Sequence, residues 1–481
     1  MIRIYLDWNV ISNLKKPEFR EIKDFIITHK KHLQFPYSPA HFADLMKSYK
    51  PNNEHFHTDL ETLEFLSEKH LIRWGEKEIE PLFATPKEYF EFEKDKENIF
   101  ELIDMEKIFQ DLDESMHELG LKKMETSTKS FYQSQPSGIE ITEESKDILK
   151  KMFPNLKSNS TMWDLMKDME PFSKKVLQDG KYYKELRNSL AEKGFRLEAN
   201  SGRWNYDEVV RNINNFLQKL GVKMTFLEYV ELSFKHKKEP VNPYEYYITA
   251  YLILDMIGYR TDKLPKPTDN MLNIQTDGEH SFYGAYCNYL VASDKNLRIK
   301  SKVLYNQFNI STKILEPNDL IPELKKVIDP DIKEINFLEE ALSFCTKENL
   351  VESFPASEEN SVETQAFRLP KFYFNYFNYV IYTYYPKQEG FVLTFRKVFK
   401  NLSRFIYYTE SESLIERITD FFGYENKEEL RVKKQEFVYK ENNIVFDWSF
   451  DGGLIRLENE EDTKRPILSY IISTKGIMVS T

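Results

Sequence analysis

The stretch Thr276–Ser301, TDGEHSFYGAYCNYLVASDKNLRIKS, decides the fold that we expect. Asp277 stands at a predicted helix N-cap, where its carboxylate can accept hydrogen bonds from the first N–H groups of the helix. The apolar run from Tyr289 to Ala292 is typical of a buried parallel strand. Asp294 follows that strand, and open α/β sheets bind ligands outside the carboxyl ends of their strands. The stretch therefore predicts a helix, a central strand and two candidate site acids.

The beginning of the chain has a similar arrangement. The run MIRIYL, residues 1–6, predicts a strand that leads directly into Asp7 and a following helix. After a second strand-like piece at 33–37, Ser38 and Pro39 are typical of the cap and first residue of a helix, which places Asp44 in its second turn. We therefore expect a strand, helix, strand, helix opening in which Asp7 and Asp44 are further site candidates.

The pattern along the chain predicts three regions. Residues 1–50 and 242–317 form a wound α/β core with a parallel sheet, because Asn242-Pro243 is a strong helix start that returns the chain to the α/β pattern. Residues 51–241 are rich in Glu, Lys, Leu and Phe at helical spacing and predict a mostly helical, acidic insertion. Residues 330–481 predict a C-terminal α+β domain, with strand-like runs at 435–439, 444–448 and 467–473.

Composition limits the class of protein. The chain has 481 residues, of which 41% are hydrophobic, so we expect a largely folded protein with more than one core. Cys287 and Cys345 are the only cysteines in the sequence, which is no disulfide framework. Neither a signal peptide nor a long apolar span is recognisable, so we expect a cytoplasmic protein without a membrane partner.

The net charge of −11 does not exclude a nucleic-acid partner. Residues 51–130 hold 21 acidic against 10 basic side chains, which accounts for the whole excess. Elsewhere acids and bases balance, so local basic patches are possible. The side chains that we predict to contact nucleic-acid phosphates follow the last candidate acid and are Lys295, Arg298, Lys300 and Lys302. A solvated helix face explains these four residues equally well.

The four aspartates, Asp7, Asp44, Asp277 and Asp294, suggest metal chemistry. A wound parallel sheet brings the ends of its strands to one edge, and carboxylates gathered there repel one another unless cations neutralise them. Oxygen ligands are those that Mg²⁺ or Mn²⁺ prefers, and two such ions can activate a water and stabilise the leaving oxygen of a phosphodiester. The expected reaction is phosphodiester hydrolysis, with the four aspartates as metal ligands and catalytic residues.

These motifs resemble the PIN-domain nuclease family. IYLDWNVISNL, residues 4–14, resembles its opening strand, DGEHSFYGAYC, residues 277–287, its third-acid helix, and YLVASDKNL, residues 289–297, its last strand and acid. The resemblance implies a metal-dependent endonuclease, usually acting on RNA and leaving a 5′-phosphate, in which Asn9 supports the first acid. Asp44 stands where the family more often has glutamate. The insertion at residues 51–241, far longer than ordinary loops, is a second departure.

Other interpretations remain open. His280, one helical turn after Asp277, can orient a carboxylate or touch a phosphate, although a packed helix histidine is the commoner case. The aromatic run Phe372–Tyr385 can stack bases or fill a core. The alternatives to an RNase are a DNA-directed nuclease and a non-catalytic nucleic-acid- or protein-binding scaffold with this fold. A toxin or phage-defence effector, with a regulatory protein partner or as a homo-oligomer, is the biological role that fold-level analogy suggests.

Overall fold

The protein is described by a computed structural model that divides into two compact units. Unit 1 contains Met1–Pro86, Tyr283–Asp294 and Phe308–Thr481, and unit 2 contains Lys87–Phe282 and Lys295–Gln307. The residues that the structure describes are 1–50, 52–94, 132–142, 145–192, 194, 196–197, 201–235, 240–264, 269–328, 337–356, 362–398, 408–439 and 444–473.

Unit 1 contains a parallel sheet in the order β2-β1-β5-β6. Its strands are β1 (Ile2–Leu6), β2 (Leu33–Gln34), β5 (Tyr289–Val291) and β6 (Lys313–Leu315). Both β1 and β5 are buried throughout, which explains why they read as continuous apolar runs. The predicted strands are confirmed, although β2 is shorter than expected. The chain adds β2 on one side of β1, and it later adds β5 and β6 on the other side. The order of the strands therefore reverses between β1 and β5, although all four are parallel.

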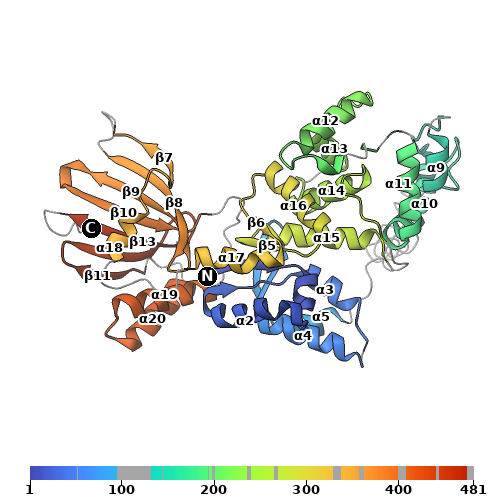
Figure 1. Cartoon of the computed structure of the whole chain (residues 1–481). Helices are drawn as coiled ribbons and strands as arrows, with labels where there is room; N and C mark the ends of the chain where they lie inside the picture. The colour runs from blue at the N-terminus through green and yellow to red at the C-terminus, as the bar shows by residue number, and fades with distance from the viewer. Residues whose placement is uncertain are drawn as a thin grey trace, which may run out of the picture. The chain divides into compact units, whose positions relative to one another are not determined.

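Helices lie around this sheet within unit 1 (Figure 1), which also contains a small antiparallel hairpin. They are α1 (Trp8–Asn13), α2 (Arg20–His29), α3 (Pro39–Met46), α4 (Glu54–Ser67), α17 (Pro317–Val327), the 3₁₀ turns η1 (Pro17–Phe19) and η2 (Lys30–His32), and the strands β3 (His70–Trp74) and β4 (Ile79–Phe83). The predicted cap at Ser38 and start at Pro39 are confirmed. Leu71 lies in the region 51–241, which we expected to be mostly helical, but it belongs to β3, because short apolar runs do not distinguish helix from strand.

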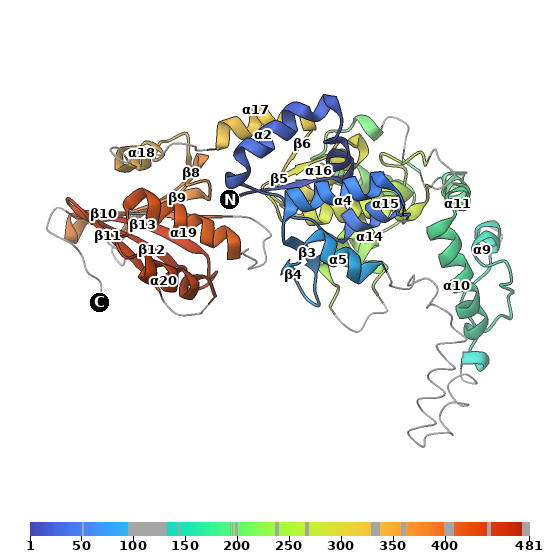
Figure 2. The ribbon, with the colours of Figure 1, turned by 90° about the horizontal axis from the view of Figure 1, so that it is seen from below.

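Unit 2 is helical in the part that the structure describes (Figure 2). Its elements are α5 (Pro86–Glu93, of which Pro86 belongs to unit 1), α9 (Lys146–Met152), α10 (Met162–Gln178), α11 (Gly180–Glu192), η3 (Ser201–Arg203), α12 (Val209–Lys219), α13 (Phe226–Leu232), α14 (Pro243–Met256), α15 (Met271–Gly284, whose last residues belong to unit 1) and α16 (Lys295–Gln307). The predicted start of α14, with Asn242 as cap and Pro243 as first residue, is confirmed.

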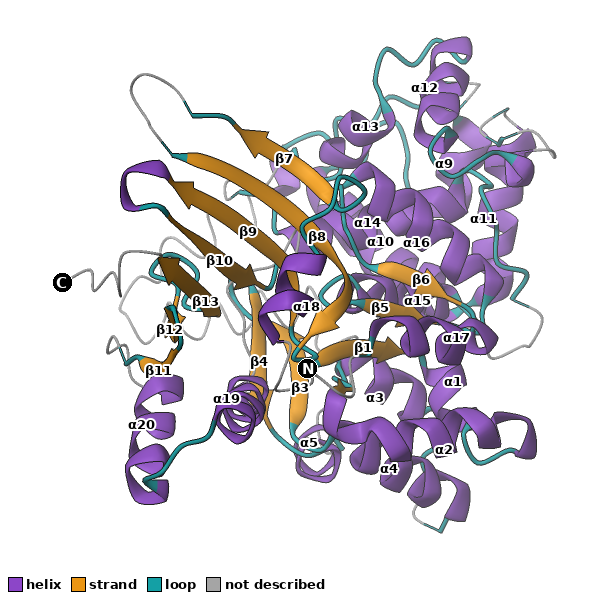
Figure 3. Ribbon diagram, turned by 60° about the vertical axis from the view of Figure 1, so that its left-hand side comes forward, coloured by secondary structure: helices purple, strands orange, loops and turns teal. Residues whose placement is uncertain are grey.

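The C-terminal part of unit 1 is an antiparallel sheet in the order β11-β12-β13-β10-β9-β8-β7, of which Figure 3 shows the long strands side by side. The elements are α18 (Phe337–Ser343), β7 (Leu350–Phe354), β8 (Glu363–Tyr373), β9 (Phe377–Tyr385), η5 (Pro386–Gln388), β10 (Gly390–Arg396), α19 (Tyr408–Phe422), α20 (Lys427–Tyr439), β11 (Phe446–Phe450), β12 (Gly453–Asn459) and β13 (Pro466–Ser473). Residues 435–439, predicted as a strand, are instead the end of α20.

One core joins this sheet to its helices. Side chains of α18, α19 and α20 pack with residues such as Val380, Leu393 and Phe395 from the central strands. Tyr373 and Phe377, from the aromatic run, are completely buried in the same cluster. That run therefore fills a core, as the commoner of its two interpretations expects. In the described residues, no helix is both long enough and apolar enough to cross a membrane.

Candidate active site

Asp7 lies at the carboxyl end of β1 and caps α1. One carboxylate oxygen, Oδ1, accepts a hydrogen bond from the N–H of Val10 at 2.8 Å. The other, Oδ2, accepts from the N–H of Ser293 at 3.1 Å, immediately after β5. The residue is 1% exposed. Because both oxygens are fixed by backbone groups, one local and one from the neighbouring strand, the position of this carboxylate depends on the correct pairing of β1 with β5.

Asp294 lies next to this contact, between the end of β5 and the start of α16. Leu6 pairs with Val291 across the two strands, and the N–H of Asp7 donates to the carbonyl of Val291 at 2.9 Å. The sheet thus brings Asp7 and Asp294 to the same edge, where its order reverses direction. This is the place at which open α/β sheets form their ligand crevice. Asp294 is partly buried.

His41, which the sequence reasoning missed, supports the same edge. Its Nδ1 accepts from the N–H of Ser38 at 3.0 Å, so Nε2 carries the proton and donates to the carbonyl of Leu6 at 2.8 Å. The hydroxyl groups of Tyr5 and Ser38 are 2.6 Å apart beside the ring. The signal was present, because His41 occupies the third helical position, where a capping box usually has Glu or Gln.

Asp44 lies in the second turn of α3, as predicted. Its Oδ1 accepts a hydrogen bond from Nζ of Lys47 at 2.6 Å, and its side chain is 18% exposed. The predicted support of Asp7 by Asn9 is not formed. Asn9 is exposed and its side chain makes no hydrogen bond in the described part of the chain, so Val10 and Ser293 take that role.

The predicted cap role of Asp277 is wrong. Helix α15 begins at Met271, and the side chain of Asn270 accepts from the N–H of Leu272 at 3.0 Å, so Asp277 lies in the middle of the helix. Asn270 and Asp277 are both residue types that favour an N-cap. Because the residues between them are compatible with a helix, the helix begins at the earlier of the two caps. Asp277 and the buried His280 belong to unit 2, whereas Asp7, Asp44 and Asp294 belong to unit 1.

Lys300 does not reach the surface. It is 0% exposed, and its Nζ donates to Asp255 at 3.1 Å and to Asp262 at 2.8 Å. Burial lowers the pKa of Lys300, but the two carboxylates outweigh it and hold the pKa above the ordinary lysine value. The ion pairs connect α16 to α14 in place of the predicted phosphate contact. Lys295 and Lys302 are exposed on the same helix and Arg298 is partly exposed, so these three remain candidates.

Carboxylate oxygens have the right chemistry for Mg²⁺ or Mn²⁺. The predicted set is not assembled as a metal site, however. Within the ranges that the structure describes, no three His, Cys, Asp or Glu side chains come together in a group that could hold a metal ion.

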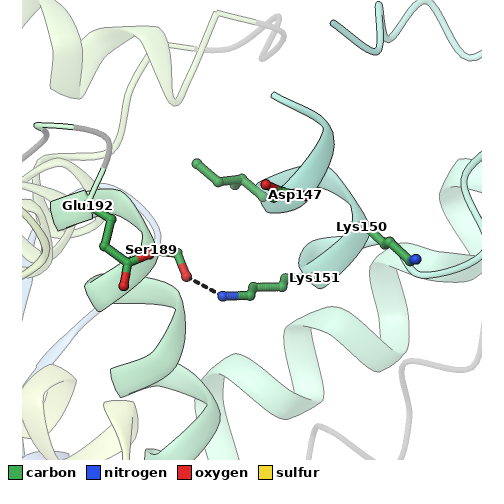
Figure 4. Close-up of a pocket in the computed structure, with 6 residues that line it drawn as sticks. Asp147, Lys150, Lys151, Ser189 and Glu192 are labelled. Atoms are coloured by element: carbon green, nitrogen blue, oxygen red, sulfur yellow. Dashed lines mark hydrogen bonds between the residues drawn. The ribbon is translucent and has the colours of Figure 1, made fainter. Parts of the chain in front are cut away.

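A hollow in unit 2 offers no catalytic alternative. It measures about 420 Å³ and is lined by side chains of α9 and α11 (Figure 4). Nζ of Lys151 donates to Oγ of Ser189 at 2.6 Å, while that hydroxyl donates to the carbonyl of Glu185 at 2.8 Å. A serine nucleophile needs a base that accepts its proton. Here Lys151 is exposed and is the donor, so Ser189 is not activated.

Comparison of the chain with protein-family models, with curated proteins and with solved structures found no match in any of the three.

Proposed function

We propose that the protein is a PIN-like, metal-dependent endonuclease whose expected substrate is RNA, with Asp7 and Asp294 as its principal catalytic carboxylates. The observation that supports this most is the hydrogen bond from the N–H of Ser293 to the Asp7 carboxylate. It lies at the point where the strand order of the parallel sheet reverses. It holds two acids at the edge where wound sheets bind ligands.

The surroundings of the two acids favour a preorganised site. His41 donates a hydrogen bond to the carbonyl of Leu6, the last residue of β1, and the N-cap hydrogen bond from Val10 holds Asp7 itself. Catalytic groups must be held close to their productive geometry by neighbours whose own positions are locked. Asp44, which also belongs to unit 1, stays in the proposal as a further ligand. Mg²⁺ or Mn²⁺ would neutralise the carboxylates and supply water activation.

The test is hydrolysis of three labelled substrates, single-stranded RNA, a tRNA pool and single-stranded DNA, with Mg²⁺, Mn²⁺ or EDTA. Asp7→Asn and Asp294→Asn should each abolish cleavage. The exchange at Asp7 keeps an N-cap residue, so the fold should persist. Asp24→Asn is the matched control, because Asp24 is an exposed acid on α2 whose partner is Arg20. Asp44→Asn and Asp277→Asn ask separately whether the two other acids contribute.

The outcomes separate the alternatives. Cleavage that needs the metal, Asp7 and Asp294 supports the nuclease, and the preferred polymer identifies RNA or DNA as the substrate. Cleavage that survives both substitutions would exclude this site. If the native chain cleaves none of the three polymers, electrophoretic binding to the same RNA and DNA would support the scaffold with this fold.

A further inference from the structure

A buried cluster of charges lies at the other end of β1, inside unit 1. Arg3 and Lys397 are almost completely buried, and Glu410, in the first turn of α19, is 0% exposed. Nε of Arg3 donates to Oε2 of Glu410 at 3.1 Å, and Nζ of Lys397 donates to Oε1. The N-terminal ammonium lies 3.4 Å from the same Oε1, so three cations share the buried carboxylate of Glu410. Burying charge in this way is costly unless every charge is compensated.

Two more guanidinium groups belong to this cluster. Arg465 donates to the carbonyl of Lys397 at 3.3 Å, and Arg417 follows Glu410 by two turns of α19. The surroundings disfavour the positive forms of these cations. Burial, only partly offset by Glu410, lowers the pKa of Lys397 to about 7, and burial lowers that of Arg417 to about 10. These positive side chains gather around the carboxylate of Glu410, and such a positive environment attracts an anion.

Three side chains around the cluster have buried polar atoms that make no hydrogen bond in the described residues. They are Nε and Nη2 of Arg417, the hydroxyl of Tyr376, and both amide atoms of Gln34. Gln34 is 1% exposed and pairs with Arg3 across β2 and β1, so the two side chains share a face of the sheet. The ring of Tyr376, which is 0% exposed, lies 4.6 Å from Nζ of Lys397. Buried polar atoms without a hydrogen bond are rare in folded proteins and destabilise them.

We propose that this cluster is a binding site for a small oxyanion of the phosphate type. Nε and Nη2 of Arg417 form a fork that matches two oxygens of such an anion, and the Tyr376 hydroxyl and the Gln34 amide are further donors. Because these groups are buried, we take inorganic phosphate, the smallest ligand of this type, as the probe. The site is separate from the candidate active site, because Arg3 and Asp7 lie about 13 Å apart along β1 at the usual rise of a strand.

The bound anion would have a structural consequence. Gln34 and Arg3 come from the parallel sheet, whereas Tyr376 lies in the turn between β8 and β9 and Arg417 lies on α19. An anion held by both groups would stabilise the packing of the two sheets within unit 1. Phosphate should therefore protect unit 1 against unfolding in proportion to its occupancy of the site.

Calorimetric titration of the full chain with inorganic phosphate, at ionic strength held constant with chloride, tests the proposal. We expect one site, and Arg417→Leu should weaken binding by about tenfold or more. Arg431→Leu is the matched control, because Arg431 is exposed on α20 and pairs with Glu428. Its affinity for phosphate should equal that of the native chain.

Tyr376→Phe is a second, milder variant in case Arg417→Leu does not fold, because it removes only a hydroxyl group. It should lower phosphate affinity by a few-fold and reduce the stabilisation that phosphate confers in thermal unfolding. The proposal is overturned if phosphate does not bind the native chain, or if Arg417→Leu binds it as well as Arg431→Leu does. It is overturned equally if phosphate raises the melting temperature of Tyr376→Phe by as much as it raises that of the native chain. The Tyr376 hydroxyl would then play no part in holding the anion.

Discussion

Replacing Lys300 by Met should destabilise unit 2 far more than the same change at Lys302. The two lysines lie on one turn of α16 and were both predicted to contact phosphates. Lys300, however, is 0% exposed and makes ion pairs with Asp255 at 3.1 Å and Asp262 at 2.8 Å. Asp255 is itself completely buried, so the substitution removes one of its counter-charges from a site without water. Arg187, 2.9 Å away, remains as its cationic partner.

Removing one partner of a buried ion pair costs about 3–5 kcal/mol. Lys302 is exposed, and surface substitutions change stability by about 0.5 kcal/mol or less. Hydrogen–deuterium exchange of the full chain, read on peptides of α14 and α16, measures the difference directly. Lys300→Met should speed exchange there by about 100-fold or more, whereas Lys302→Met should leave it nearly unchanged.

RNA binding by the same two variants provides the second measurement. If the proposed function is right, Lys302→Met should weaken RNA binding modestly and in a salt-dependent way, since it removes a phosphate contact candidate. Equal and small effects of both variants on exchange, together with equal losses of RNA affinity, would refute the reasoning, because Lys300 would then behave as a solvated surface cation.

Three further predictions rest on single contacts. Burial lowers the pKa of His70 to about 4, so the unfolded chain binds more protons than the folded chain between about pH 4 and 6.5. The free energy of unfolding should therefore fall by up to about 3 kcal/mol as the pH drops through that window. His70→Gln should flatten this dependence, measured by urea unfolding at several pH values. His41→Ala leaves the buried carbonyl of Leu6 without its donor, so we expect a loss of about 1–3 kcal/mol and a lower kcat, and an unchanged kcat would show that the histidine does not support the site. A Cβ on Gly278 would lie 3.1 Å from the ring of Tyr251, so Gly278→Leu should cost about 1–3 kcal/mol in thermal unfolding, and a neutral result would mean that α15 and α14 are less closely packed.

Local chemistry made much of the secondary structure predictable. The strand before Asp7, the helix that begins at Pro39 and the helix that begins at Pro243 depend on apolar runs and caps within a few residues of each start. Errors occurred where two local signals competed. Asn270 and Asp277 are both good caps, and the short apolar run at 435–439 suits a strand or the last turn of a helix equally well.

The apolar period of α16 contained a signal that was available and unused. Lys300 follows Leu297 by three residues and precedes Leu304 by four, which places it on the buried face of the helix. A lysine in that position must find carboxylates or lose its charge. The period could therefore have predicted burial, but not that Asp255 and Asp262 would supply the partners, because they lie on other segments.

The sequence by itself determined that a strand runs into Asp7, that another runs into Asp294, and that the chain between them is long and acidic. Only the tertiary structure decided that these strands are neighbours, that the N–H of Ser293 meets the Asp7 carboxylate, and that Arg3 meets Glu410. The physical reason is range. Caps and apolar periods act over one or two turns of backbone, whereas strand order and buried ion pairs join residues hundreds of positions apart through packing that no local pattern encodes.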